Sequence, residues 1–194
     1  MARAKAFNEV DVLDKAMLLF WTKGYHATSA KDLVNDLGLS RSSLYDTFGD
    51  KRTLYLKALQ YYEEDVLGNI ISLVIHSDDI RETLSAIFSI IIKQHTYEKA
   101  PKGCFMVNAA VELAAHDLEV AYIVSKSQRA FERALEKAFT KAKDTQKLTP
   151  NYDATYLAKF FNNVMTGLRV NVRANQNSDD FKEVINVSLS ILDG

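Results

Sequence analysis

Apolar residues recur every three to four positions along almost the whole chain, the spacing that gathers them on one face of an α-helix. The first such stretch covers residues 9–23. Gly24 follows it at the position where a left-handed C-cap residue is expected. The pattern therefore predicts a helix that begins near residue 9 and ends at Gly24.

Two short amphipathic stretches come next. Ser29 and Asp32 form a capping-box-like pair ahead of residues 30–37, and Ser40 stands as a cap ahead of residues 41–47. Two short helices joined by a tight turn are typical of the helix-turn-helix, whose second helix enters the major groove of DNA. We therefore treat residues 41–47 as a candidate recognition helix.

The remaining pattern predicts longer helices with few interruptions. Asp50 caps a fourth helix that is expected to run unbroken to about Ser77. Beyond it, the apolar spacing predicts further helices over residues 79–98, 104–115, 117–143, 153–174 and 180–192. The chain is predicted to be all-α with about nine helices: a helix-turn-helix domain at residues 1–50, joined by the fourth helix to a larger helical bundle at residues 51–194.

The composition agrees with a helical globular protein. Of 194 residues, 47% are hydrophobic and 25% charged, and only 7 Gly and 2 Pro occur, too few for the many turns of a β-sandwich or barrel. The single cysteine excludes an internal disulfide bond. No apolar run reaches the length of about 20 residues that a membrane-spanning helix needs, and no secretory leader is recognisable. A cytoplasmic protein is expected.

Charge is distributed unevenly. The net charge of −1 argues weakly against a nucleic-acid partner, but residues 1–60 hold nine basic and seven acidic side chains, whereas the rest of the chain is acidic on balance. Any surface that binds nucleic acid is therefore expected in the N-terminal third.

The candidate recognition helix has the chemistry for this task. Its outward positions carry hydrogen-bonding side chains: Arg41, Ser42, Ser43 and Tyr45. Leu44 and Phe48 are expected to face inward, and Arg41 is the one side chain here that can grip guanine with two hydrogen bonds. Because any capped amphipathic helix shows a polar face, the alternative is a helical protein-interaction module without specific DNA binding, which would fit the near-neutral charge.

Catalysis is not predicted. The chain contains no H-E-x-x-H, G-x-S-x-G, G-x-G-x-x-G or P-loop pattern, and its four histidines are too scattered to form a metal pair on one helix. We expect neither an enzyme nor a bound cofactor or metal.

Residues 20–54 carry a resemblance to a known family. Residues 24–29 read GYHATS, residues 37–40 read LGLS, and residues 43–51 read SLYDTFGDK. Together these segments resemble the N-terminal domain of the TetR family of bacterial transcriptional regulators. The C-terminal part resembles the family in helical pattern and length only.

The resemblance implies a function and an interface. Members of the family are homodimers that bind a palindromic operator, most of them as repressors, and a small effector bound by the C-terminal domain lowers their affinity for DNA. The DNA contacts of the family map here onto Ser29, Lys31, Ser40, Arg41, Ser42, Ser43, Tyr45, Thr47 and Lys51. Asp46 departs from the pattern, because a histidine or aromatic residue often follows the tyrosine, and an aspartate near phosphates is repulsive unless it points at a cytosine amine or away. The dimer is expected to form through residues 153–192.

The effector pocket is predicted more loosely, within residues 80–172. Its candidate lining residues are His95, Cys104, Asn108, Tyr122, Phe161, Asn162 and Met165. Each also has a plainer interpretation as an ordinary core residue. Cys104 stands out because a predicted helix start and Lys102 beside it would favour the thiolate, and it resembles a cysteine placed likewise in family members that sense electrophiles or oxidants. The opposing interpretation is a small, buried, inert side chain.

Overall fold

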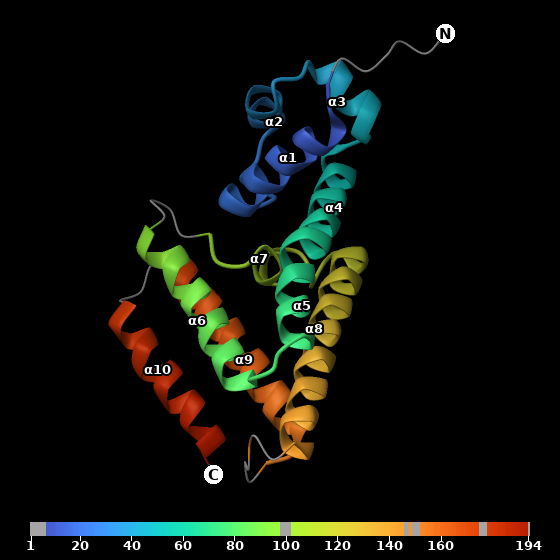
Figure 1. Cartoon of the computed structure of the whole chain (residues 1–194). Helices are drawn as coiled ribbons and strands as arrows, with labels where there is room; N and C mark the ends of the chain where they lie inside the picture. The colour runs from blue at the N-terminus through green and yellow to red at the C-terminus, as the bar shows by residue number, and fades with distance from the viewer. Residues whose placement is uncertain (1–6, 98–101, 146–147, 149–151, 175–177, 194) are drawn as a thin grey trace.

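A computed structural model describes residues 7–97, 102–145, 148, 152–174 and 178–193. All regular structure within these ranges is helical (Figure 1). In chain order the elements are α1 (Glu9–Lys23), α2 (Ala30–Leu37), α3 (Arg41–Phe48), α4 (Lys51–Tyr62), the π-helical segment η1 (Glu63–Leu67), α5 (Gly68–Ile75), α6 (Ile80–Tyr97), α7 (Phe105–Glu112), α8 (Leu118–Asp144), α9 (Ala154–Arg173), α10 (Ser178–Ser190) and the 3-10 turn η2 (Ile191–Asp193). The all-α prediction is confirmed.

The predicted fourth helix is continuous but not uniform. It begins at Lys51 with Asp50 as its cap, and the Asp50 carboxylate accepts a hydrogen bond from the backbone N–H of Thr53 at 2.7 Å. It does not stay α-helical to Ser77, because η1 interrupts it and α5 ends at Ile75. A π-helical turn holds one more residue per hydrogen-bonded ring than an α-helix, so α5 continues α4 with its faces rotated.

The buried side chains form two apolar cores. The N-terminal core is built by α1 to α4 together with α7 and the first turns of α8. The bundle core is built by α5, α6, the rest of α8, α9 and α10. Figure 1 shows α1, α2 and α3 grouped at one end, with α4 and α5 following one line beside α8, and α6, α9 and α10 at the other end. The long helix α8 therefore takes part in both cores.

An aromatic cluster joins the helix-turn-helix to the bundle. The ring of Tyr55, on α4, lies 5.1 Å from that of Phe20 and 5.4 Å from that of Phe105, both in edge-to-face contact. These rings are at most 1% exposed. Because α4 and α7 share the core of α1, residues 51–62 pack as part of the N-terminal core. The predicted domain boundary at residue 50 stays a prediction.

Among the helices of the described part of the chain, none is long and apolar enough to cross a membrane.

Candidate nucleic-acid interface and ligand pocket

Short polar contacts fix the turn between α2 and α3. Gly38 ends α2 and donates its backbone N–H to the carbonyl of Val34 at 3.2 Å. The hydroxyl of Ser40 then accepts the backbone N–H of Ser43 at 3.1 Å and so caps α3. Leu44 is fully buried beneath this helix. The cap and the apolar anchor hold α3 in one orientation relative to α2, which is what a helix that inserts into a groove requires.

The outer face of α3 is polar and accessible. Arg41 and Ser42 are exposed, and the guanidinium carbon of Arg41 lies 5.9 Å from the centre of the Tyr45 ring. The hydroxyls of Ser42 and Ser43 lie 3.1 Å and 2.9 Å from that of Ser40. This places one long cationic side chain beside an aromatic hydroxyl, with small hydroxyls around them, a set of donors that suits phosphates and base edges.

Two lysines flank this face. Lys51 begins α4, and its ammonium lies 4.4 Å from the centre of the Tyr25 ring. Partial burial lowers the pKa of Lys51, although nearby Glu112 and Asp32 oppose this shift. Lys31, in the first turn of α2, is exposed. Both ammonium groups lie at helix N-termini, where free backbone N–H groups already favour an anion such as phosphate.

Ser29 has a structural task that limits its role as a contact. Its hydroxyl accepts the backbone N–H of Asp32 at 3.1 Å and donates to the Asp32 carboxylate at 2.7 Å. Lys23 pairs with the same carboxylate at 2.7 Å. These hydrogen bonds hold the pKa of Asp32 well below its usual range, so the capping pair stays ionised. Ser29 would have to release Asp32 before donating to a phosphate.

The two remaining positions of α3 differ in accessibility. Asp46 is exposed, and Thr47 is half-buried. Asp46 makes no ion pair with any residue that the structure describes. The predicted contact residues thus lie at the starts of α2 and α4 and along α3, with an acidic side chain on the recognition helix.

Three polar contacts tie the helix-turn-helix to the bundle, and none was predicted from the sequence. At the end of α7, the carboxylate of Glu112 accepts the backbone N–H groups of Tyr25 and His26 at 2.9 Å and 2.7 Å. Gly24 lies against this carboxylate, because an added Cβ with its φ of +87° would come within 3.0 Å of a Glu112 oxygen. The turn after α1 therefore binds the Glu112 carboxylate through its backbone N–H groups.

The other two contacts use arginines. Arg52 donates two hydrogen bonds to Asp117, at 2.7 Å and 2.9 Å, and one to Glu119 at 3.1 Å. Arg173, the last residue of α9, donates to the carbonyls of Trp21 and Thr22 at 3.2 Å and 3.0 Å. Cations near the C-terminal carbonyls of α1 are favoured by the helix dipole. The ends of α7 and α9 thus contact the turn after α1 and the end of α1, and the start of α8 contacts the start of α4.

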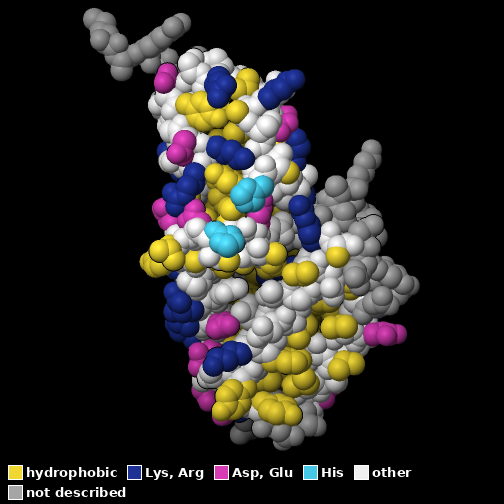
Figure 2. All heavy atoms as spheres, turned by 180° about the vertical axis from the view of Figure 1, so that it is seen from behind, with side chains coloured by type: hydrophobic (Ala, Val, Ile, Leu, Met, Phe, Trp, Pro, Cys, Tyr) yellow, Lys and Arg dark blue, Asp and Glu magenta, His cyan; other side chains and the backbone are white. Residues whose placement is uncertain are grey.

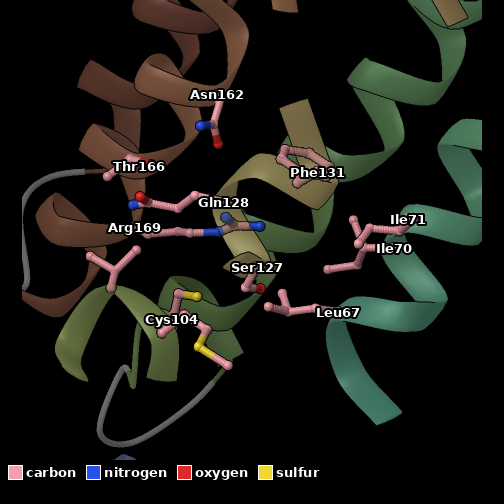
Figure 3. Close-up of a pocket in the computed structure, with 12 residues that line it drawn as sticks. Leu67, Ile70, Ile71, Cys104, Ser127, Gln128, Phe131, Asn162, Thr166 and Arg169 are labelled. Atoms are coloured by element: carbon pink, nitrogen blue, oxygen red, sulfur yellow. The ribbon is translucent and has the colours of Figure 1, made fainter. Parts of the chain in front are cut away.

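A pocket lies in the bundle between α5, α7, α8 and α9 (Figure 3). Its walls are mostly apolar, with a few neutral polar groups and one charged side chain, Arg169. The lining residues are Leu67, Ile70, Ile71, Cys104, Met106, Val107, Ser127, Gln128, Phe131, Asn162, Thr166 and Arg169. A concave site with apolar walls and few polar groups is the usual form of a small-molecule site.

Of the seven predicted pocket residues, the structure brings Cys104 and Asn162 to this lining. Phe161 and Met165 are fully buried in the bundle core. Asn108 donates to the carbonyl of Lys102 at 2.9 Å and does not line the pocket.

Two others lie elsewhere. Tyr122 is 64% exposed on α8, so it lies outside the pocket. His95 belongs to α6, but its side chain lies outside the described residues.

Cys104 is the N-cap residue of α7, and its thiol is buried at 3% exposure. The hydroxyl of Tyr62 donates to its sulfur at 3.5 Å. The predicted position at a helix start is thus confirmed, whereas the thiol is shielded from solvent.

Sequence reasoning missed Arg169. The sequence could have indicated it, because Arg169 stands between Leu168 and Val170 in a helix with a wide apolar face. A cation on such a face needs a partner or a cavity. Arg173 gave no comparable signal, because a cation in the last turn of a helix is ordinary. Glu112 gave none either, because its partners are backbone N–H groups, which no side-chain pattern marks.

Large apolar side chains remain exposed on α9 and α10. They are Tyr156, Phe160, Val170, Val184 and Val187. Figure 2 shows hydrophobic side chains gathered over the lower half of this face, where these helices lie, and Lys and Arg side chains spread over the upper part. An extended apolar surface on a single chain is typical of a protein–protein interface.

An exposed, capped second helix in a helix-turn-helix, joined to a helical bundle that contains a pocket, defines the class of DNA-binding regulators with a ligand domain. Comparison with protein families agrees. Residues 12–58 match the model described as bacterial regulatory proteins of the tetR family, and residues 81–187 match the tetracyclin repressor-like C-terminal domain. The chain belongs to the TetR family.

Individual relatives support this assignment. The chain is 33% identical to the uncharacterised HTH-type transcriptional regulator YezE of Bacillus subtilis over 132 residues, 68% of each protein. It is 33% identical to the repressor ComR of Escherichia coli over 131 residues, 67% of this chain and 62% of ComR.

Solved structures share the fold. A cysteine mutant of the TetR family regulator CifR, complexed with 26-base-pair operator DNA, superposes with a TM-score of 0.84 at 23% identity and covers 97% of this chain and 98% of that one. The reduced form of NemR from E. coli superposes with a TM-score of 0.80 at 14% identity, and the match covers 91% of this chain and 92% of NemR.

Proposed function

We propose that the protein is a ligand-responsive repressor that binds a palindromic operator as a homodimer through α3 and is released by a small effector in the bundle pocket. The observation that carries the proposal is the outer face of α3, where exposed Arg41 lies beside Tyr45 on a helix held by its cap and by Leu44. As a DNA-binding protein of bacterial type, it would act in the cytoplasm.

The contacts divide into two kinds. Lys31 and Lys51, at helix N-termini, position the protein on phosphates and carry no sequence information. Arg41 is the side chain that reads sequence, because its planar fork matches the two acceptors of guanine in the major groove.

A dimer follows from the operator geometry. Two recognition helices that enter successive major grooves must lie about 34 Å apart and be related by two-fold symmetry. The exposed apolar side chains of α9 and α10 supply the self-complementary surface, within the predicted segment 153–192. Sedimentation of the protein at micromolar concentration should show a dimer, and a monomer alone would contradict this part of the proposal.

The pocket and the DNA-binding end share two helices. α7 lines the pocket with Met106 and holds the α1–α2 turn with Glu112. α9 lines it with Arg169 and holds the end of α1 with Arg173, one turn later. A ligand that displaces either helix by 1–2 Å therefore moves the helix-turn-helix, and so changes the separation of the two recognition helices in a dimer.

The proposal is tested by binding of the purified protein to DNA from immediately upstream of its own gene, with a scrambled competitor and a salt series. Arg41→Ala and Tyr45→Ala are expected to weaken specific binding, the former by about 10- to 100-fold. Arg133→Ala is the matched control, since Arg133 is exposed on α8, far along the chain from α3. Absent or sequence-blind binding would favour the protein-interaction module instead.

An electrophilic or oxidising effector acting at Cys104 is a second hypothesis for the ligand. In its favour, Cys104 lines the pocket; against it, the thiol is 3% exposed and bonded to Tyr62. Because Cys104 is the only cysteine, maleimide labelling of the folded protein reports on it alone, with Cys104→Ser as the blank. No labelling at neutral pH would end this hypothesis.

A further inference from the structure

Arg169 is a largely buried cation with no hydrogen-bond or ion-pair partner among the residues that the structure describes. The residue is only 9% exposed. Within the described part of the chain, its guanidinium donates to no acceptor and pairs with no carboxylate. A buried arginine is ordinarily paired, because removing an ionised group from water costs several kcal/mol unless an opposite charge or hydrogen bonds compensate. An unpaired arginine beside a cavity is a group that an anionic ligand can pair with.

The surroundings of Arg169 favour a ligand of negative charge. Among the described residues that line the pocket there is no aspartate or glutamate, so the charge of its wall comes from Arg169. Figure 3 shows the Arg169 side chain running from α9 toward α8, where Ser127 and Gln128 lie. The hydroxyl of Ser127, which is 4% exposed, likewise has no hydrogen-bond partner among the described residues. Two helices therefore direct unused hydrogen-bonding groups into one space.

The opposite wall selects the body of the ligand. Leu67, Ile70 and Ile71, from the end of η1 and the start of α5, line it together with Phe131 of α8. These side chains offer no hydrogen bond, so they favour an apolar group.

We propose that the pocket takes an amphipathic anion, a carboxylate that pairs with Arg169 and carries an apolar body against the α5 wall. The guanidinium fork matches the two oxygens of a carboxylate, and the neutral donors nearby can share them. This names the chemical class of the effector and so rests on the proposed function for its regulatory meaning, but ligand binding itself can be measured without DNA.

The size of the cavity adds a condition. Its volume is about 40 Å³, a few times the 10–15 Å³ that one water molecule needs. A carboxylate fits this space, whereas an apolar chain longer than a few carbons must displace the α5 wall. Binding of the longer anions is therefore coupled to movement of a wall that continues into α4.

The first experiment compares octanoate with octanamide, which has the same chain and no charge. Calorimetric titration of the full-length protein without DNA is expected to give a dissociation constant for octanoate at least tenfold lower than for octanamide, with butanoate and dodecanoate as shorter and longer probes. Equal affinities for octanoate and octanamide would overturn the proposal, as would failure of all three carboxylates to bind. This comparison needs no variant.

The second experiment locates the charge. Arg169→Gln should bring the ratio of the octanamide and octanoate dissociation constants close to one, whereas Arg133→Gln, an exposed arginine on α8 outside the pocket lining, should leave it unchanged. Because Arg169→Gln removes an unpaired buried charge, its ligand-free melting temperature should not fall. A preference for octanoate that persists in Arg169→Gln would contradict the proposal.

Failure of this inference and failure of the proposed function give different results. A protein that binds operator DNA in the absence of ligand but no carboxylate is a repressor with another effector. A protein that prefers octanoate through Arg169 but binds no DNA retains the anion site and loses the regulatory assignment.

Discussion

The N-terminal core and the bundle core are ordered by different means. Around the N-terminal core, side chains satisfy the ends of helices: Ser29, Ser40 and Asp50 each accept a backbone N–H at a helix start. In the bundle, Asp79 caps α6 in the same way, but α9 begins without a side-chain cap, and the core is formed by apolar packing around Phe161 and Phe139, whose rings stack 5.6 Å apart. Capping contacts fix orientation at a single residue, whereas apolar packing constrains volume and leaves shape adjustable.

The difference matches two tasks. A surface that reads DNA must present its side chains at fixed positions, while a ligand site must tolerate a change of volume. Glu112 and Arg173 connect the two by hydrogen bonds to the turn after α1 and to the end of α1.

The largest effect is expected in the bundle core. Phe161→Ala removes a ring that is 0% exposed and should lower the free energy of unfolding by about 3–5 kcal/mol. Its neighbour Phe160, 37% exposed on the same helix, is the matched control, and Phe160→Ala should cost clearly less. Urea denaturation followed by circular dichroism measures both. Equal losses would contradict the assignment of Phe161 to the core.

The next largest effect on stability is expected at Glu112. Glu112→Gln keeps the shape of the side chain, but its amide nitrogen then faces one of the two backbone N–H groups that the carboxylate now accepts. We expect a loss of about 1–3 kcal/mol in unfolding free energy. The effector should also release DNA less completely in this variant.

Glu82→Gln is the control for Glu112→Gln, because Glu82 is an exposed carboxylate on α6, outside the contacts that join the bundle to the helix-turn-helix. If both variants keep full release of DNA by the effector, Glu112 does not carry the coupling.

The ion pair between Arg52 and Asp117 predicts that the stability of the protein depends on pH in the acid range. The hydrogen bonds from Arg52, with those from the backbone N–H groups of Val120 and Glu119, lower the pKa of Asp117 from 3.8 to about 2. A pKa that is lower in the folded state gives stability that is complete above the unfolded value and is lost as the pH falls through the folded value. The loss between pH 4 and pH 2 should therefore be smaller in Asp117→Asn.

The magnitude of this difference should be at most about 1 kcal/mol, because Arg52 is 45% exposed and solvent screens the pair. Urea titrations at several pH values measure it. A pH profile of Asp117→Asn identical to that of the natural protein would show that this pair adds nothing to stability.

The smallest effect on stability is expected at Lys31. Lys31→Ala should change the unfolding free energy by less than about 0.5 kcal/mol, since the side chain is exposed. Its effect should appear in DNA binding, as a reduction of about 1 in the slope of log affinity against log salt concentration, uniform across sequences. Arg41→Ala should instead change the preference between operator variants, so the two substitutions separate positioning from reading.

The N-terminal end was more predictable from sequence than the bundle, for a physical reason. Its helices are short and their ends are marked by residues with few other uses, as Ser29 and Ser40 show by accepting the N–H groups expected of them. In the bundle, periodicity predicted each long helix within a few residues, but it could not say which apolar face lines a cavity. Tyr122, predicted at the pocket, is 64% exposed, whereas Arg169 was overlooked.

Contacts between segments far apart in the chain could not be predicted from the sequence either. The partner of Glu112 is a pair of backbone N–H groups 86 and 87 residues away, and no side-chain pattern records a backbone partner. The interruption of the fourth helix at Glu63–Leu67 was missed too, because these residues are ordinary helix formers.

That π-helical segment makes the winding of one helical turn a determinant of specificity. Each residue turns an α-helix by about 100°, and the π-helical turn absorbs about one residue's share of that rotation, so regular α-helical winding of all five residues Glu63–Leu67 would rotate α5 against α4 by about 100°. Ile70 and Ile71 would then leave the pocket wall and other residues of α5 would take their places. A change in the winding of one turn, with no residue gained or lost, would exchange the ligand-facing surface while leaving the DNA-reading surface as it is.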